Sequence, residues 1–377
     1  MTAHPPTIRA LFVLPRAQYA PDTILTGHLL AHLPRAVVEP AVCFFEDGPL
    51  TGQWTRTLDL PTRALAPEDQ PGSRRKTREG LATMVRHVGA QVVHAVGPAA
   101  QLVAARVAQA AGIPGLWSQP GVTQWGRLRD VRAALSSARA VLLHTALGER
   151  AQRRLLFRRG RCRRITAGVG LPDRLPEHRR ADARARLGLE ADAIVAASAG
   201  PLDDPRIHEC FLRAAASLCA ARSRARLVIA GTAGAPETAR ALAERVAELG
   251  LERRTRMVGP WDLTAALDAA DIAVHAAATD AREVVVPVGL LQAMASGTAV
   301  VVQNGPLVDE LVVPGENALL TPPGEPERLA VALLALADDP DRRLALATAA
   351  AATARARHDA ARMADEVVAL YREFVAT

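Results

Sequence analysis

The chain has 377 residues, which is too long for one ordinary hydrophobic core and suits two domains. Hydrophobic residues make up 49% of it, which excludes wholesale disorder, and no uncharged apolar run of about 18 residues is present, which excludes a membrane-spanning helix. The net charge of +7 is uneven, because residues 1–178 carry 24 basic and 12 acidic side chains (+12) and residues 179–377 carry 22 and 27 (−5).

Strand-like and helix-like apolar patterns alternate in the first half. Strands are expected at 8–14, 38–45, 91–96, 114–119 and 140–145, with helices at 24–33, 99–112 and 147–160. The apolar run before Pro15 is only about six residues long, which is too short for the core of a signal peptide. A stretch rich in Gly and Pro at 168–180 then predicts a domain boundary.

The second half repeats the alternation. Strands are expected at 193–200, 225–231, 255–259, 270–276, 298–303 and 318–323, with helices at 207–221, 236–249, 262–268, 289–296 and 326–337. Residues 345–377 begin Ala-rich and predict one long helix. Because strands and helices alternate in both halves, the sequence predicts an α/β protein of two doubly wound parallel-sheet domains. Ligands are then expected at the carboxyl ends of the strands, in the cleft between the domains.

The order of these pieces resembles the family 4 retaining glycosyltransferases, which have the two-Rossmann (GT-B) fold. The donor half of that family is similar to roughly residues 138–375, through "RLVIAGTAG", "ALDAADIAVHAA" and "LLQAMASGTAVVV", and "QVVHAVGPAAQLVAARVAQAAGIPGLW" resembles a strand and helix of its first half. The resemblance implies an acceptor domain at 1–175, a nucleotide-sugar donor domain at 176–355, and a C-terminal helix at 356–377 that returns to the first domain.

The resemblance also implies an activity. We expect transfer of a sugar from a nucleotide-diphosphate sugar to a hydroxyl acceptor (a glycan, lipid or natural product), with retention and with neither metal nor other cofactor. The alternative is a catalytically impaired homologue that acts as a partner subunit or ligand-binding protein. Pro201, Val284, Gln292 and Val96 favour that alternative, because the family usually has Arg, Glu, Glu and His at these positions.

Two charged residues are the principal donor-site candidates. Arg206 stands where the family has a Lys, beside a predicted helix start, and its guanidinium can hold a phosphate. Glu283 lies one residue before the usual carboxylate, and slack before Pro287 would let it orient the sugar. The alternatives are a solvated surface arginine and an exposed loop acid.

The helix beginning at 289 supplies the other donor contacts. Its opening amides, those of Gly289, Leu290 and Leu291, can cradle phosphate, and Gln292 can hydrogen-bond the ribose hydroxyls. The alternative is a helix that merely starts a buried segment. The remaining donor-binding candidates are Gly200, Gly231, Thr232 and Trp261, the last as a stacking surface for the base or as an interface aromatic.

Candidates in the first half are fewer. His94 is the one histidine kept from the family's His-x-His strand, and it is either catalytic or a buried, hydrogen-bonded structural residue. The candidate acceptor contacts are Tyr19, His28, Trp117 and Gln119.

One basic segment suggests a surface partner. The stretch from Arg150 to Arg164 holds eight Arg in fifteen positions, with Leu and Phe between them. It suits peripheral contact with an anionic membrane at its inner face, or a solvated Arg-rich surface. Nucleic-acid binding is not expected, because no helix-turn-helix or zinc pattern is present. The four cysteines lack metal-ligand spacing, which fits free thiols in the cytoplasm.

Overall fold

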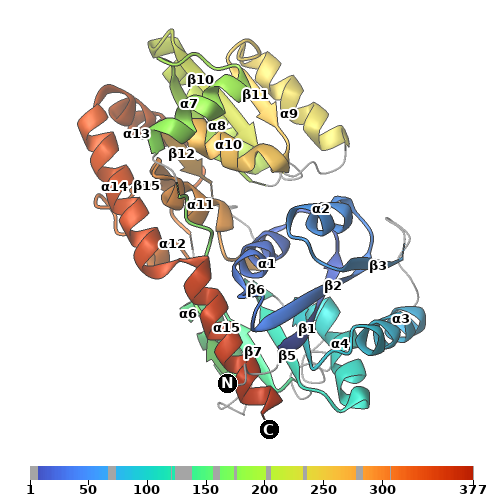
Figure 1. Cartoon of the computed structure of the whole chain (residues 1–377). Coiled ribbons are helices and arrows are strands. Elements are labelled where there is room, and N and C mark those ends of the chain that lie inside the picture. The colour runs from blue at the N-terminus through green and yellow to red at the C-terminus, as the bar shows by residue number, and fades with distance from the viewer. Residues whose placement is uncertain are drawn as a thin grey trace. The chain divides into compact units, whose positions relative to one another are not determined.

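Figure 1 shows a computed structural model of the whole chain. The structure describes residues 7–66, 74–119, 121–123, 138–155, 162–173, 176–200, 205–231, 236–276, 283–305 and 307–376. The chain forms two compact units. Unit 1 contains Met1–Gly168, Arg282–Val286 and Asp359–Thr377, and unit 2 contains Val169–Ala281 and Pro287–His358.

Unit 1 is built on a parallel sheet in the order β3-β2-β1-β4-β5-β7-β8. Its strands are β1 (Ile8–Arg16), β2 (Val38–Glu46), β3 (Thr62–Ala66), β4 (Val92–Val96), β5 (Gly115–Gln119), β7 (Ala140–Leu143) and β8 (Cys162–Arg164). Its helices are α1 (Pro21–His32), α2 (Pro49–Thr57), α3 (Arg74–His87), α4 (Pro98–Ala111), α6 (Ala146–Leu155) and α15 (Ala360–Val375). The run Leu11 to Leu14 is fully buried, as expected for a strand covered on both faces.

Unit 2 is built on a second parallel sheet in the order β11-β10-β9-β12-β14-β15. Its strands are β9 (Ile194–Ala199), β10 (Ala225–Ala230), β11 (Thr255–Val258), β12 (Ile272–His275), β14 (Ala299–Gln303) and β15 (Leu319–Thr321). Its helices are α7 (Pro176–Leu187), α8 (Pro205–Ala221), α9 (Pro236–Glu248), η2 (Pro260–Asp262), α10 (Leu263–Ala269), α11 (Val288–Ser296), α12 (Val308–Leu311), α13 (Pro326–Asp338) and α14 (Pro340–Arg357).

The predicted strands and helices lie near observed elements, but α2, β3 and α3 fall in a stretch for which no element was predicted. In both sheets the first strand lies in the middle and the order reverses beside it, between β1 and β4 in unit 1 and between β9 and β12 in unit 2. Ligands of open α/β sheets bind outside the carboxyl ends of the strands at such a reversal. The fold therefore places one candidate crevice in each unit.

The predicted single C-terminal helix is wrong. The chain forms two helices, α14 and α15, which are separated at His358 and Asp359. The carboxylate of Asp359 accepts a hydrogen bond from the Ala361 N–H, as an N-cap residue does. The second helix, α15, packs against α1 and β1 in unit 1 (Figure 1), as the resemblance implies.

A glycine permits the close chain approach at this return. A Cβ atom on Gly168 would lie 2.5 Å from the carbonyl oxygen of Asp359 and 2.7 Å from the Ala360 nitrogen. Because real side chains do not come so close to backbone atoms, only glycine fits here without a backbone shift.

A short ribbon adds a segment of the second half to unit 1. The strands β6 (Gly121–Thr123) and β13 (Glu283–Val285) pair in antiparallel register, with Glu283 opposite Thr123. Glu283 was expected in a loop with slack before Pro287, so this strand was not predicted.

Candidate functional site

The carboxyl edge of the sheet in unit 2 carries the first candidate site. Gly200 follows β9, and its N–H donates to the Ala230 carbonyl over 3.1 Å. Gly231 follows β10, and its N–H donates to the Val258 carbonyl over 3.3 Å. Both predicted donor-binding glycines thus continue the hydrogen-bonded ladder at the edge where ligands of such sheets bind.

The first turn of α11 stands at the same edge. A Cβ on Gly289 would lie 3.7 Å from the Cβ of Ala199, the last residue of β9. The helix therefore begins directly beside the end of the strand that borders the sheet reversal.

Not every opening amide of α11 is available for phosphate. The N–H groups of Leu290 and Leu291 both donate to the Pro287 carbonyl, over 3.0 and 3.2 Å. The predicted cradle is therefore smaller than expected, because the first-turn donors that no helical carbonyl can reach are those of Val288 and Gly289. The Leu290 and Leu291 side chains are buried, and Gln292 is partly buried.

Four donor-site candidates are described only in part. The backbone of Arg206 lies in the first turn of α8, and that of Trp261 lies in η2. Glu283 lies in β13 and belongs to unit 1, so its backbone is fixed in a strand instead of the slack loop that the sequence suggested. The side chains of these three residues, and all of Thr232, lie outside the described part, so their roles stay predictions.

His94 is held at the centre of unit 1. Its Nδ1 lies 2.6 Å from the Tyr371 hydroxyl, and its Nε2 lies 2.7 Å from the Ser118 hydroxyl. The ring is fully buried and stacks on Phe12 with a centroid separation of 4.8 Å. Both contacts are satisfied by a neutral ring, in which one nitrogen donates and the other accepts.

The environment of His94 suits structural hydrogen bonding. Burial lowers its pKa to about 3, and nearby His144 adds to this effect. A ring with both nitrogens engaged and so low a pKa is a poor general base near neutral pH. The placement therefore favours the structural interpretation of His94 over the catalytic one.

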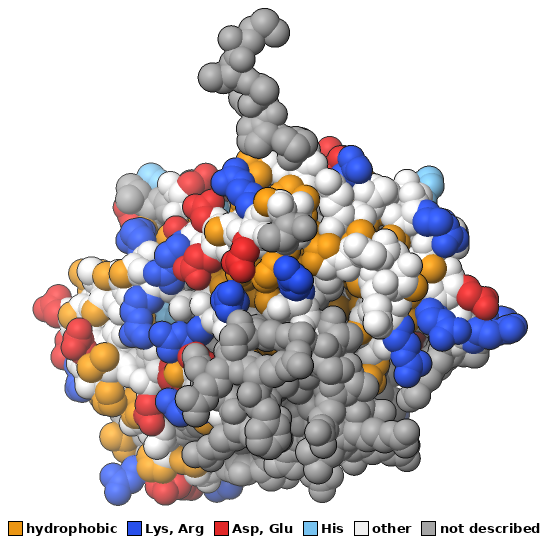
Figure 2. Space-filling view, turned by 90° about the horizontal axis from the view of Figure 1, so that it is seen from below, with side chains coloured by type: hydrophobic (Ala, Val, Ile, Leu, Met, Phe, Trp, Pro, Cys, Tyr) orange, Lys and Arg blue, Asp and Glu red, His pale blue; other side chains and the backbone are white. Residues whose placement is uncertain are grey.

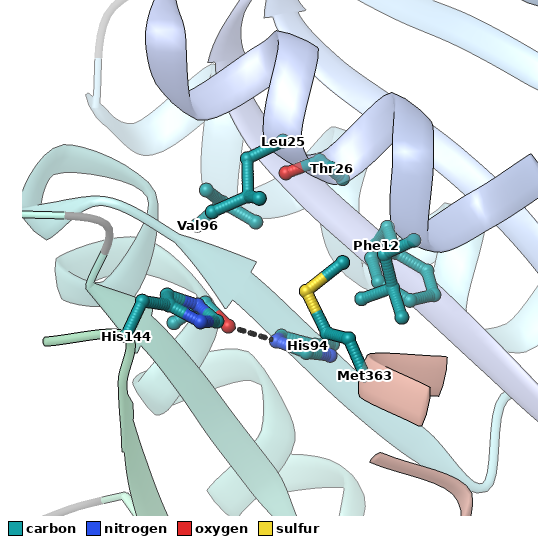
Figure 3. Close-up of a pocket in the computed structure, with 9 residues that line it drawn as sticks. Phe12, Leu25, Thr26, His94, Val96, His144 and Met363 are labelled. Atoms are coloured by element: carbon teal, nitrogen blue, oxygen red, sulfur yellow. Dashed lines mark hydrogen bonds between the residues drawn. The ribbon is translucent and has the colours of Figure 1, made fainter. Parts of the chain in front are cut away.

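A small cavity lies beside this network (Figure 3). It is lined by Phe12, His94, Val96 and Ser118 of the sheet, by His144 just after β7, by Leu25, Thr26 and Leu29 of α1, and by Met363 of α15. Its volume of about 10 Å³ is about what one water molecule needs, so it does not hold a sugar. The Nδ1 of His144 lies 2.9 Å from the Ile165 carbonyl, and burial lowers the pKa of His144 to about 4.

The four acceptor candidates lie on β5, on α1 and in the segment after β1. Trp117 is fully buried in a core cluster with Val141 and Leu143, so direct acceptor contact is disfavoured. Gln119, two residues along β5, is also buried. Tyr19 follows β1 and hydrogen-bonds Gln53, and His28 is partly buried on α1. An acceptor role for any of them stays a prediction.

The Tyr371–His94 contact gives a direct test of how α15 is attached. Replacing Tyr371 with phenylalanine removes the hydroxyl and leaves Nδ1 of His94 buried without a partner. We expect the free energy of unfolding to fall by about 1–3 kcal/mol, the usual effect of an unsatisfied buried group, measured by urea denaturation. Tyr19→Phe is the matched control, since Tyr19 is only half-buried and water can replace its bond; equal losses in the two variants would contradict the assignment.

Basic side chains are scattered over the described part of the face in Figure 2. On the face in Figure 2, Lys and Arg side chains form several separate groups with acidic side chains between some of them. Most side chains of the basic stretch at 150–164 lie outside the described part, so membrane contact stays a prediction. In the described ranges, no helix is long and apolar enough to cross a membrane, and no group of three or more His, Cys, Asp or Glu is arranged to hold a metal ion.

Comparison with known proteins points to one enzyme class for the second half. Residues 194–339 match the family described as "Glycosyl transferases group 1". The matched part begins with β9 and ends after α13, so it includes the sheet reversal and the start of α11.

Curated relatives match over similar lengths. The D-inositol 3-phosphate glycosyltransferase of Saccharomonospora viridis is 33% identical over 224 residues, which is 57% of this chain and 50% of the relative. The D-inositol 3-phosphate glycosyltransferase of Kineococcus radiotolerans is 35% identical over 212 residues, which is 51% of this chain and 47% of the relative. The chain thus spans about half the length of the curated relatives it matches.

Solved structures match over nearly the whole chain. Anabaena Alr3699/HepE in complex with UDP and glucose has a TM-score of 0.78 at 20% identity, covering 97% of this chain and all of that one (100%). Sucrose-phosphate synthase from Thermosynechococcus elongatus has a TM-score of 0.73 at 19% identity, and the match covers 98% of this chain and 99% of that one. At such identities the likeness concerns the fold, and it confirms the predicted class of two Rossmann-like parallel-sheet domains.

Proposed function

We propose that the chain is a glycosyltransferase that moves a sugar from a nucleotide-diphosphate sugar to a hydroxyl acceptor, with retention and without a metal ion. One observation carries the proposal. The segment that matches the glycosyl transferase family contains a sheet reversal, and α11 begins beside the end of β9 at that reversal. A Cβ atom on Gly289, in the first turn of α11, would lie 3.7 Å from the Cβ of Ala199, the last residue of β9. A helix start at a sheet reversal is where α/β folds bind nucleotide phosphates.

The proposed residues act mainly by position and charge. The N–H groups of Val288 and Gly289, with the guanidinium of Arg206, stabilise the diphosphate as negative charge builds on it. Gln292 contacts the ribose, and Glu283 orients the sugar. The bond between the anomeric carbon and the phosphate oxygen breaks, and its electron pair leaves with the diphosphate. The acceptor oxygen forms the new bond, and its proton passes to the departing diphosphate oxygen.

Donor binding is the first test. Titration calorimetry with UDP-, GDP-, ADP- and TDP-glucose should reveal binding of at least one, and product analysis with that donor should reveal sugar release or transfer that EDTA leaves unchanged. Absence of binding to all four would instead favour the impaired homologue that the four altered positions suggest.

Arg206→Ala tests the phosphate contact within this proposal. We expect turnover to fall at least about tenfold, because one charge-assisted contact to the leaving group is lost. Arg213→Ala is the matched control, since Arg213 lies on the same helix but is exposed and pairs with Glu327. Unchanged turnover in Arg206→Ala would remove this residue from the mechanism.

A further inference from the structure

His275, the last residue of β12, stands out at the sheet reversal of unit 2. Side chains alternate between the two faces of a strand. Ile272 and Val274 lie in the core cluster that contains Phe211 and Leu218 of α8. The His275 side chain therefore points to the opposite face of the sheet.

The neighbours of His275 place it beside the start of α11. The parallel register pairs Val274 with Ser198, so His275 is level with Ala199, the residue over which Gly289 stands. On its other side, His275 pairs with Val302 of β14. The imidazole and the first turn of α11 thus share one face at the carboxyl ends of β9 and β12.

The ring is available for a ligand. It is partly exposed, and in the described part of the chain its nitrogens have no hydrogen-bond partner. Burial alone lowers its pKa to about 4, and no charged side chain contributes to the shift. The positive end of α11 also opposes a second proton, so the ring is neutral near pH 7 and offers one donor and one acceptor.

Because the ring is partly exposed, water can occupy its hydrogen-bonding nitrogens in the free protein. A bound diphosphate would displace that water and accept the hydrogen bond from the ring's N–H. The amides of Val288 and Gly289, which begin α11, favour an anionic oxygen at the same place.

We propose that His275 is a donor-binding residue whose neutral imidazole donates a hydrogen bond to an oxygen of the donor's diphosphate at the first turn of α11. The inference rests on the proposed function and adds to it a residue that the family resemblance did not mark. The contact lies on the leaving group, so His275 positions the diphosphate.

The test compares three variants, with UDP and uridine as probes in titration calorimetry. His275→Leu should weaken UDP binding about ten- to a hundredfold, the value of one hydrogen bond to a charged group, and leave uridine binding unchanged. His275→Gln, which keeps an N–H donor of similar reach, should retain most of the affinity. His178→Leu removes an exposed histidine of α7 in the same unit and should change nothing.

Thermal unfolding of the free protein separates ligand binding from a structural role. Because the ring has no protein partner to lose, His275→Leu should unfold at the same temperature as the parent or higher, with weaker UDP binding. A lowered midpoint together with unchanged UDP affinity would make His275 structural and overturn the inference. If the parent binds UDP and His275→Leu binds it equally, only this inference fails; if the parent binds none of the four nucleotide sugars and no UDP, the proposed function fails as well.

Discussion

Replacing Arg184 with leucine should lower the free energy of unfolding of unit 2 by about 3–5 kcal/mol, the range for breaking a buried ion pair by removing one partner. The guanidinium is 6% exposed and donates to the Asp271 carboxylate over 2.7 Å, to the Ala269 carbonyl over 3.0 Å, and to the Ala191 carbonyl. It thereby ties α7 to the last residue of α10 and to Asp271, the residue before β12.

The expected loss of stability is large because the Arg184→Leu variant keeps the buried groups that Arg184 had paired with. Asp271 is 8% exposed and also accepts a 2.8 Å bond from the Val195 N–H, so it stays buried and negatively charged when Arg184 is gone. The Ala269 and Ala191 carbonyls lose their donor as well. In the described part of the chain, Arg180 is the other ion-pair partner of Asp271, and its longer distance of 3.8 Å offsets the charge less well.

Calorimetry of matched variants checks this prediction. Arg224→Leu removes an arginine whose pair with Asp192 is largely exposed, so a loss of only about 0–1 kcal/mol is expected. Adding Asp271→Asn to Arg184→Leu should recover part of the loss, because the buried charge is then removed too. Similar losses for Arg184→Leu and Arg224→Leu would refute the idea that burial decides the difference.

The alternation of strands and helices was predictable because buried parallel strands are apolar runs of a few residues between amphipathic helices. The runs at 8–14, 193–200 and 298–303 correspond to β1, β9 and β14 within a few residues. Overall charge and composition, in contrast, do not indicate which segments contact one another in the fold. The ribbon of β6 and β13 has only three residues per strand and pairs segments far apart in sequence. Strands this short have no apolar periodicity from which the pairing could be predicted.

The sequence contains a signal for the break between α14 and α15, but the high helix propensity of the region led to the prediction of one continuous helix. The Ala-rich run favours a continuous helix, but Asp359 is a good N-cap residue, and it stands where the chain passes from unit 2 to unit 1. Propensity is a weak guide once tertiary packing offers α15 a place against α1.

The candidate site was predictable in its position and less so in its residues. The expectation that ligands bind at the carboxyl ends of parallel strands leads to the edge where Gly200 follows β9 and Gly289 stands beside it. A polar residue at the end of a predicted strand was the available signal for His144 and His275. The partner of His94 could not be read from sequence, because Tyr371 lies 277 positions away and its hydroxyl reaches the ring only when α15 returns to unit 1.

Acidification should destabilise unit 1 through the buried His94 and His144, and His28 on α1 adds to the effect because burial lowers its pKa to about 4. The pKa values of His94 and His144 are about 3 and about 4, below the value of 6.5 for an unburied ring, because burial disfavours the charged form. Above pH 6.5 both rings are neutral in the folded and the unfolded chain, and their contribution to stability is fully present. As the pH falls below 6.5, the unfolded chain binds protons that the folded chain excludes, so stability is lost until the folded pKa values are reached.

The expected slope is about 1.4 kcal/mol per pH unit for each ring, so between pH 6.5 and pH 4.5 the two rings together remove about 5 kcal/mol. Asp22 works in the opposite direction, because burial raises the pKa of its carboxyl group, and the folded chain then takes up that proton more readily than the unfolded chain. Its contribution is common to all the variants below and cancels in their comparison.

Urea denaturation between pH 7 and pH 4.5 measures the slope, with the fluorescence of Trp54 and Trp117, both buried in unit 1, as the signal. His144→Gln should reduce the slope by about one proton whatever it does to the stability at pH 7, since an amide does not titrate in this range. His87→Gln, at an exposed position of α3, should leave the slope as it is. If parent and His144→Gln lose stability in parallel, protons are being taken up elsewhere, and the neutral, buried state assigned to His144 is wrong.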